Sequence, residues 1–496
     1  MAAYLLAIDQ GTTSSKGVLF SGRGKLIAMA QQKFAQYYPA DAWVEHNPEE
    51  IWVSTLNVCR NVIKTAGIDA SDVTSIGISN QRETTLLWDR FTGQPLYNAI
   101  VWQDRRTAEY CSIFKKQGKE ALIQSKTGLL LDPYFSASKL VWLLDNVKNA
   151  RALADEGRLA FGTVDSFLLW RLTGGRSHFT DATNASRTQL FNIHSMTWDE
   201  ELLSIFDVPA SLLPEVKNSS DEFGCTEKSL FGCSIPINAM IGDQQAALVG
   251  QACFKSGMGK CTYGTGSFLM LNSGEAPLKS THKMLTTVAY QIEGRTNYAL
   301  EGSIFVAGAA IQWLRDGLKI IDSVEESEHY AQLFPDTKGV YMVPAFTGLG
   351  APHWDPDARG ALLGLTRDTG IGEIVSASLH SVAYQTLDLL GAMKSDGASF
   401  PEVLKIDGGM ANNPWFVQFL ADMLNVEVSR PSFTERTAFG AACLAGLSSG
   451  VYSSLDELSK LQGATTLFTP TFSDTQREAL YAGWINALHR VKSKSC

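Results

Sequence analysis

The chain has 496 residues, of which 45% are hydrophobic and 19% charged, and its formal net charge is −9. This composition can form large packed cores and excludes a disordered or low-complexity chain, while the length indicates more than one domain. The negative charge and the lack of Lys/Arg clusters argue against a nucleic-acid partner. No apolar run approaches the roughly 20 residues of a membrane span, and the N-terminus lacks the positive region of a signal peptide, so we expect a cytosolic protein.

The cysteines and histidines give no indication of a zinc site. Eight cysteines are scattered along the chain without a CxxC pair, and the eight histidines form no HExxH motif. Such scatter in a long chain without a signal peptide predicts free thiols, and it favours neither disulfides nor a zinc site.

The first predicted element is a β-hairpin with an unusual tip. Residues 4–8 and 17–20 are predicted strands, and residues 9–16 between them, DQGTTSSK, form a predicted polar turn. Gly, Thr and Ser offer closely spaced N–H and hydroxyl donors with little bulk, as a polyphosphate requires when it approaches the main chain. The alternative is a decorated hairpin without a ligand. The predicted phosphate-binding residues of the tip are Thr12, Thr13 and Ser14.

Two charged residues lie at the ends of this tip. Lys16 can add a point charge that attracts phosphate oxygens. Asp9, at the end of the first strand, can hold Mg²⁺ through water molecules, because that ion prefers oxygen ligands and keeps much of its hydration. The hairpin is therefore a candidate site for a polyphosphate with its magnesium ion.

The next predicted element is a helix that ends at Ala66. Asn47-Pro48-Glu49-Glu50 supplies an N-cap, a first-turn proline and an acid at the third helical position, and apolar and small residues recur at helical spacing from Ile51. Gly67 then ends the pattern.

Polar residues follow two further predicted strands. The strand at 74–79 is followed by Asn80 to Thr85, and the strand at 237–241 by Gly242 to Gln245. Ligand sites in α/β proteins lie at such strand ends. A polyol hydroxyl both donates and accepts hydrogen bonds, so an Arg/Glu pair and an Asp/Gln pair can bind it from two sides. The residues predicted to do so are Arg82, Glu83, Asp243 and Gln244, with Trp102, Tyr134 or Phe268 covering the carbon face.

Each of these pairs has a plain structural alternative. Arg82 and Glu83 can form a surface ion pair without any ligand. Asp243 is the best candidate for a general base, because phosphoryl transfer to an alcohol requires a carboxylate that receives the hydroxyl proton. The same residue can instead cap the helix predicted to start at Gln244.

The tip of the first hairpin is echoed about half a chain later. Gly264-Thr265-Gly266-Ser267 precedes an apolar strand at 268–272, and Thr265 is a further candidate for phosphate binding. We interpret the echo as two related domains, residues 1–250 and 251–496, whose tips face each other across a cleft where ligands bind. The boundary is placed near Gly250.

Two motif matches carry no predicted chemistry. Gly257 to Thr262 resembles the end of a P-loop but lacks Ser or Thr directly after the lysine. Gly446 to Gly450 fits the GxSxG pattern of hydrolases, yet it follows a predicted helix at 438–447 instead of a strand. We expect a loop at a helix end there.

The second half continues the alternation of strands and helices. Residues 374–390 carry a helical apolar stripe, and a strand that ends at Asp407 is followed by Gly408-Gly409, which can let a base or ribose approach the backbone. The alternation predicts the α/β class, with sheets covered by helices.

These segments together resemble the FGGY family of carbohydrate kinases over nearly the whole chain. Tyr134 to Asn146 resembles one family signature and Gly360 to Gln385 the other. The motifs most similar to the members that phosphorylate glycerol are Trp43 to His46, Asn80 to Thr85, Trp102 to Arg106, Gly242 to Gln245 and Phe346 to Trp354. The resemblance implies two actin-like (ribonuclease-H-like) domains that close around ATP and substrate.

The resemblance also implies roles for single residues. Glycerol would contact Arg82, Glu83, Tyr134, Asp243 and Gln244, with Trp102 and Phe268 as an apolar wall. Asp243 would be the base, and we assign it with Asp9 to the Mg²⁺ site. The nucleotide site would be lined by Gly308, Gln312, Gly409 and Asn413, and the hairpin tips would bind its phosphates.

The chain departs from the family pattern at two places. Lys16 stands where many members carry Arg, which keeps the charge but loses the bidentate fork for phosphate oxygens. Pro414 follows Asn413 where relatives often show Asn or Asp.

Our expectation is an enzyme that phosphorylates glycerol with ATP and Mg²⁺ and forms a homo-oligomer, a dimer or a tetramer. The alternative within this class is a kinase for a larger polyol or ketose. An actin-like filament protein or an Hsp70-like chaperone would share the nucleotide fold, but neither needs a polyol site.

Overall fold

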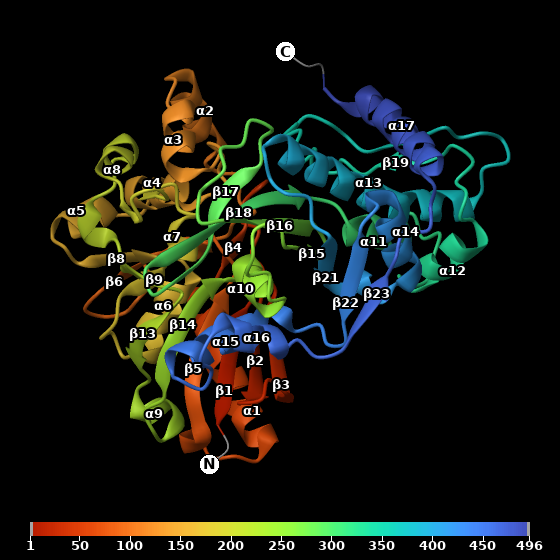
Figure 1. The fold of residues 1–496 in the computed structure, drawn as a ribbon. Helices are drawn as coiled ribbons and strands as arrows, with labels where there is room; N and C mark the ends of the chain where they lie inside the picture. The colour runs from red at the N-terminus through yellow and green to blue at the C-terminus, as the bar shows by residue number, and fades with distance from the viewer. Residues whose placement is uncertain (1–2, 494–496) are drawn as a thin grey trace.

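Two groups of five strands with the same order organise the molecule (Figure 1), whose computed structural model describes residues 3–493. The first group runs β3 (Leu26–Lys33), β2 (Ser14–Ser21), β1 (Tyr4–Gln10), β5 (Val73–Asn80), β14 (Pro236–Gly242). The second runs β18 (Arg295–Ile304), β16 (Ser267–Gly274), β15 (Gly259–Tyr263), β21 (Val403–Asp407), β22 (Glu427–Pro431). In both groups the first three strands are antiparallel and the last three parallel. The predicted α/β class with two related domains is confirmed.

The two groups join through single strands at their edges. β13 (Ser220–Cys225) extends the first group and β17 (Leu285–Ile292) the second, and Ser220 pairs with Ile292. With β23 (Thr465–Phe468) at the far edge, the sheet has 13 strands. The two halves of the chain therefore share one continuous sheet.

Large insertions surround these strands. Between β2 and β14 the chain adds β4 (Glu45–His46), α1 (Pro48–Ala66), β6 (Leu86–Asp89), β7 (Ala99–Ile100), α2 (Ala108–Lys116), α3 (Glu120–Thr127), α4 (Ser136–Asn146), α5 (Ala150–Asp155), β8 (Leu159–Gly162), α6 (Val164–Leu172), β9 (Phe179–Asp181), α7 (Ala182–Ala185), β10 (Phe191–Asn192), β11 (Thr197–Trp198), α8 (Glu200–Phe206), β12 (Glu215–Lys217) and α9 (Lys228–Phe231). The second half adds α11 (Gly308–Asp316), α12 (Glu326–Leu333), β19 (Tyr341–Val343), β20 (Ala361–Leu363), α13 (Ile371–Ser395), α14 (Pro414–Leu424), α16 (Leu455–Lys460) and α17 (Asp474–Val491).

The caps predicted for α1 are present. The side chain of Asn47 accepts a hydrogen bond from the backbone of Glu49, Pro48 is the first helical residue, and Gly67 closes the helix in a left-handed conformation at φ 66°. These contacts satisfy backbone groups that a helix leaves free at its ends. The helical stripe predicted at 374–390 lies within α13.

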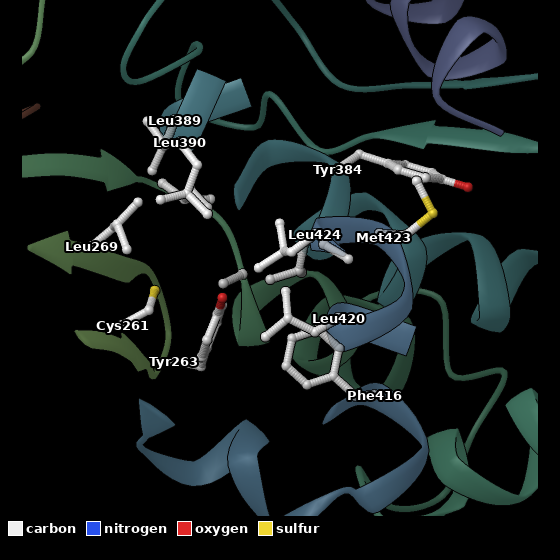
Figure 2. Close-up of a cluster of buried hydrophobic side chains, with 14 of the residues drawn as sticks. Cys261, Tyr263, Leu269, Tyr384, Leu389, Leu390, Phe416, Leu420, Met423 and Leu424 are labelled. Carbon is white, nitrogen blue, oxygen red and sulfur yellow. The ribbon is translucent and has the colours of Figure 1, made fainter. Parts of the chain in front are cut away.

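A core between β15, β16, α13 and α14 supports the second half. Side chains such as Tyr263, Leu269, Leu389 and Phe416 converge in this layer (Figure 2) and are buried. α13 and α14 thereby cover the strands that carry the second hairpin.

Two short helices from different halves cross in close contact. α10 (Asp243–Gly250) follows β14, and α15 (Arg436–Ser448) follows β22 and lies against β1 and β5 (Figure 1). A Cβ atom on Gly440 would lie 1.9 Å from the carbonyl oxygen of Ala246, and one on Gly250 would lie 2.0 Å from that of Arg436. Only glycine allows the two backbones to approach this closely.

The structure corrects the predicted bounds of the first turn. Ser14, Ser15 and Lys16 belong to β2, and Asp9 pairs with Lys16 in the hairpin register, so the turn is Gly11 to Thr13 and not residues 9–16. Polar side chains suggested a turn, but the pairing with β1 and β3 keeps this segment extended.

The cysteines and the two motif matches agree with their predictions from sequence. The seven cysteines described here are free thiols, as predicted, while Cys496 lies outside the described residues with the rest of 494–496. The lysine of the P-loop match is in β15, and the GxSxG match begins inside α15, so neither forms the motif it resembles. Among the helices of residues 3–493, none combines the length and apolar character needed to cross a membrane.

The crossing of α10 and α15 gives a test of stability. Gly440→Ala should lower the free energy of unfolding by roughly 1–3 kcal/mol, because the new methyl group must displace the Ala246 carbonyl. The matched control is Gly391→Ala, an exposed position within α13 where a Cβ meets nothing within 4 Å. It should raise the free energy of unfolding by roughly 0.5–1 kcal/mol. Urea unfolding measures both, and equal effects would contradict the close approach.

Candidate active site

The first hairpin tip is held by side chains from outside the hairpin. The Trp102 indole N–H donates to Thr12 Oγ1 at 3.0 Å, and Gln31 donates to Ser14 Oγ at 2.8 Å. Thr13 is exposed. The tip is thus a supported turn that presents Thr13 and backbone groups to solvent.

Lys16 has a partner that the sequence did not suggest. Its Nζ lies 2.7 Å from Glu435 Oε2, so the first hairpin is tied to the segment that precedes α15. Burial opposes the charge of Lys16, but Asp9 and Glu435 raise its pKa above the ordinary lysine value. The ammonium is therefore charged and already paired.

Asp9 lies beside Lys16 at the end of β1. Burial raises the pKa of its carboxyl to about 7, Lys16 opposes that rise, and the carboxylates of Glu435 and Asp243 add to it. Within residues 3–493, no hydrogen bond reaches the Asp9 carboxylate. The carboxylates of Asp9 and Asp243 repel each other and have oxygens free to bind a cation. Such a donor set fits a hydrated Mg²⁺ ion.

Arg82 and Glu83 are buried, so the alternative of a surface ion pair is wrong. Their side chains are 2% exposed, and Arg82 Nε lies 4.0 Å from Glu83 Oε1. Both residues follow β5 in the loop before β6, and Glu83 has a left-handed backbone with φ 60°. A non-glycine residue in this conformation is uncommon and has a cost in conformational energy.

Asp243 begins α10 and faces Arg82. Its Oδ1 lies 3.1 Å from Arg82 Nε and accepts a hydrogen bond from the Gln244 backbone at 2.7 Å, which leaves Oδ2 without a partner among the described residues. Burial raises the pKa of Asp243, although Arg82 and Lys260 oppose the shift. Asp243 is the first residue of α10 and Gly242 is the N-cap, so the capping alternative is wrong, and one carboxylate oxygen of Asp243 remains open.

Gln244 is oriented by Lys260, a fully buried lysine of β15. Lys260 donates to Gln244 Oε1 and, at 2.9 Å, to Thr262 Oγ1. Because the amide oxygen accepts from Lys260, the amide NH₂ of Gln244 is left to donate elsewhere.

The three predicted aromatic residues come together. Trp102 packs edge-on against Tyr134 and Phe268, with ring centroids 5.7 and 6.3 Å apart. Phe268 comes from β16 of the second half, so the wall joins both halves.

The residues assigned to the nucleotide form a second cluster. Gly308 donates to the Gly264 carbonyl at 3.0 Å, and a Cβ on it would lie 3.5 Å from Met410, which places α11 beside both the second tip and the turn after β21. Gly409 borders open space, and Thr265 and Gln312 are exposed. The Asn413 side chain caps α14 by accepting from Phe416, and Pro414 is the first residue of that helix, where proline is favoured.

A cavity of about 260 Å³ lies at the ends of β21 and β22. Four of its lining residues belong to the segment 406–413, which was predicted to let a base or ribose approach the backbone, although neither Gly409 nor Asn413 lines it. Its lining comprises Ile406, Asp407, Ala411, Asn412, Arg430, Pro431, Ser432, Thr434 and Thr466.

Four charged residues of the site were not predicted from the sequence. Arg187, Lys260, Glu301 and Glu435 all contact predicted residues. Glu301 in β18 and Lys260 in β15 are charged residues in largely buried strands, and a charge among apolar neighbours was the available signal.

Comparisons with known proteins agree along the whole chain. The family models of the N-terminal and C-terminal domains of the FGGY family of carbohydrate kinases match residues 4–250 and 259–449. Glycerol kinase of Ectopseudomonas mendocina is 59% identical over 494 residues, 100% of each chain, and glycerol kinase 1 of Pseudomonas aeruginosa is 59% identical over 495 residues, 100% of each.

Solved structures show the same architecture. Plasmodium falciparum glycerol kinase with ADP superimposes with a TM-score of 0.93 at 37% identity and covers 100% of this chain and 99% of its own. Gluconate kinase from Lactobacillus acidophilus has a TM-score of 0.89 at 22% identity, with 99% and 98% coverage, and this likeness concerns the fold alone.

The raised pKa of Asp9 predicts a pH dependence of stability. Because the folded pKa of about 7 exceeds the ordinary value of 3.8, the folded chain binds the proton more tightly, and Asp9 lowers the free energy of unfolding as pH rises between these values. Asp9→Asn should therefore be more stable than wild type at pH 8, by roughly 1–3 kcal/mol, and by less at pH 5. Urea unfolding in the presence of EDTA measures the difference.

The control for this prediction is Asp396→Asn. Burial acts against the charge of Asp396, yet contacts with Ser280, His282 and Thr281 lower its pKa below the ordinary value. Its removal should destabilise the protein at pH 8, the opposite sign. A destabilised Asp9→Asn variant at pH 8 would contradict the pKa assignment.

Proposed function

Since the chain belongs to the FGGY family of carbohydrate kinases, we propose that it transfers the γ-phosphoryl group of ATP to a terminal hydroxyl of glycerol, forming glycerol 3-phosphate. The observation that carries the proposal is the contact of Arg82 Nε with Asp243 Oδ1 at 3.1 Å, which joins the hydroxyl-binding pair to the candidate base. Relatives that share 59% of the sequence over their whole length bear the name glycerol kinase. Membership in a kinase family also argues against a filament protein or a chaperone.

Asp243 acts as the general base in this mechanism. Arg82 and the Gln244 backbone hold Oδ1, so Oδ2 is the oxygen that accepts the proton of the attacking hydroxyl. Burial raises the pKa of the carboxyl, which makes it a stronger base than an ordinary aspartate. The Gln244 NH₂ group, directed by Lys260, can donate to a hydroxyl oxygen of the substrate.

ATP is bound between the two hairpin tips. Thr12, Thr13, Ser14 and Thr265 supply donors for its phosphates, and Gly308, Gln312, Gly409 and Asn413 surround the nucleoside. Lys16 would interact with a phosphate while it remains paired with Glu435. Closure of the two domains, with the boundary near Gly250, would exclude water from the transfer.

Magnesium would be held by Asp9 and Asp243 through oxygen atoms and water. When bound, the ion neutralises charge on the transferred phosphoryl group. The repulsion between the two carboxylates would be relieved by the same ion.

The aromatic wall favours glycerol over a larger polyol or ketose. Trp102 packs against both Tyr134 and Phe268, and this wall would restrict the length of a substrate beside Arg82 and Glu83. The wall and the ion pairs together suit a three-carbon chain with a hydroxyl on each carbon.

A substrate panel tests the proposal. ADP release with Mg-ATP is measured for glycerol, erythritol, xylulose, ribulose and gluconate, and glycerol should exceed the others in kcat/KM by orders of magnitude. Asp243→Asn should lower kcat for glycerol by roughly 10²–10⁴-fold, the usual contribution of a general base. Asp396→Asn, whose carboxylate contacts Ser280, Thr281 and His282, should leave kcat unchanged. Preference for a larger sugar would refute the substrate, and an active Asp243→Asn variant would refute the base.

The hydrogen bond from Trp102 to Thr12 predicts a link between the substrate wall and the phosphate tip. Trp102→Phe keeps an aromatic ring but loses the donor, so KM for ATP should rise a few-fold, up to roughly tenfold for one hydrogen bond. Trp142→Phe is the matched control, because that ring packs against Trp43 and Arg106 away from the tip. An unchanged KM for ATP in Trp102→Phe would exclude the link.

A further inference from the structure

Two buried charged residues contact the pair that is proposed to bind the polyol. Glu301 accepts from Arg82 Nη1 at 2.5 Å and from Arg82 Nη2 at 3.1 Å. Arg187 donates from Nε to Glu83 Oε1 at 2.6 Å and from Nη2 to Glu301 Oε1 at 3.0 Å. The four side chains therefore form a closed ring, in which Arg82 and Glu83 are 4.0 Å apart.

The ring is electrically balanced and has almost no contact with solvent. Its two cations alternate with its two anions, and none of the four side chains is more than 2% exposed. Glu301 lies in β18 of the second half, whereas the other three residues belong to the first half. The site near Arg82 is thus completed by both halves of the chain.

Stability alone does not account for such a ring. Replacing buried ion pairs with apolar residues of similar size is often neutral or stabilising, because the charges lose their hydration. The Arg187 Nη1 group is buried without a partner among residues 3–493, and Glu83 has a left-handed backbone at φ 60°, so the ring includes two further costs. Features that cost stability are expected where a function requires them.

The hydrogen bonds of the ring leave specific atoms of Arg82 and Glu83 free to bind a ligand. Arg82 donates from Nη1 to Glu301 and Gln245 and from Nη2 to Glu301, which leaves one Nη2 hydrogen, while Nε lies 3.1 Å from Asp243 Oδ1 as an ion pair. Glu83 uses Oε1 for Arg187, and its Oε2 has no partner among the described residues. One donor and one acceptor therefore remain on adjacent residues, which matches the donor and acceptor of a hydroxyl group.

We propose that Glu301 and Arg187 are positioning residues that hold Arg82 and Glu83 for recognition of a substrate hydroxyl, and so determine which polyols the site accepts. The inference rests on the proposed function, and deepens it by naming residues that select the substrate without touching it.

The charge states agree with this role. Burial acts against the charge of Glu301, but Arg187 and Arg82 outweigh it and lower the pKa to about 2, so Glu301 remains ionised. Burial raises the pKa of Glu83, and the strongest opposing effect comes from Arg187. Arg187 thus favours the ionised acceptor that a hydroxyl requires.

Glu301→Gln tests the inference through substrate discrimination. We would measure kcat and KM for glycerol, propane-1,2-diol and propane-1,3-diol, two analogues that each lack one hydroxyl. KM for glycerol should rise roughly 10- to 100-fold with a smaller change in kcat, since a binding interaction is lost. The preference for glycerol over at least one analogue should fall about tenfold or more, because the variant no longer positions the groups that read that hydroxyl. Arg187→Lys, which keeps the charge but not the fork, should show the same changes in weaker form.

A control variant separates an effect on substrate preference from an effect on protein stability. Glu45→Gln removes a carboxylate that is equally buried and accepts from Tyr97, Asn98 and Arg106. It should lower the melting temperature without altering the preference among the three substrates. Equal losses for all three substrates in Glu301→Gln, or the same change in Glu45→Gln, would overturn the inference.

Two outcomes distinguish this inference from the proposed function. If wild type prefers a larger sugar, glycerol is wrong as substrate. The preference of Glu301→Gln is then measured between that sugar and its deoxy derivative, and an unchanged preference refutes the inference. If Glu301→Gln does not fold, Arg187→Lys decides: a changed preference supports the ring, and an unchanged one refutes it.

Discussion

The guanidinium of Arg82 is the junction on which the geometry of the site depends. It lies next to carboxylates from three parts of the chain, namely Glu83 beside it, Asp243 at the start of α10 and Glu301 in β18. A buried cation requires such partners, and the planar fork of arginine fixes their directions. The candidate base and the candidate hydroxyl acceptor are therefore set by one group, and a shift of any of these carboxylates alters the other contacts of Arg82.

The crossing of α10 and α15 supplies the second constraint. α10 begins at Asp243, and α15 begins directly after Glu435, the partner of Lys16. Because Gly250 and Gly440 let the two helices touch backbone to backbone, the starts of both helices are placed relative to β1 and β5. Asp9, Lys16, Asp243 and Glu435 are consequently brought together by the packing of these two helices.

Local patterns were enough to predict much of the fold. The caps of α1, the stripe of α13 and the echo of the two tips depend on neighbouring residues, and the structure contains each of them. The predicted bounds of the first turn were wrong, because strand pairing keeps Ser14 to Lys16 extended. The partners of Arg82 and Lys16 could not be found by spacing, because Glu301 is 219 residues from Arg82 and Glu435 is 419 residues from Lys16. Such contacts depend on the tertiary fold.

The charged residues of the site fall into two groups, those whose charge is compensated by partners in the protein and those whose charge is not. Glu301 has a lowered pKa because two arginines pair with it, so its charge is compensated within the protein. Asp9 and Lys260 show the opposite behaviour: burial raises the pKa of the acid and lowers that of the lysine, and each shift favours the neutral form. On the proposed function, a magnesium ion beside Asp9 would lower the raised pKa of its carboxyl. On the same proposal, the compensated charges would hold the polyol-binding groups in place, while the uncompensated charge of Asp9 lowers stability in the free protein and would be relieved by a bound magnesium ion.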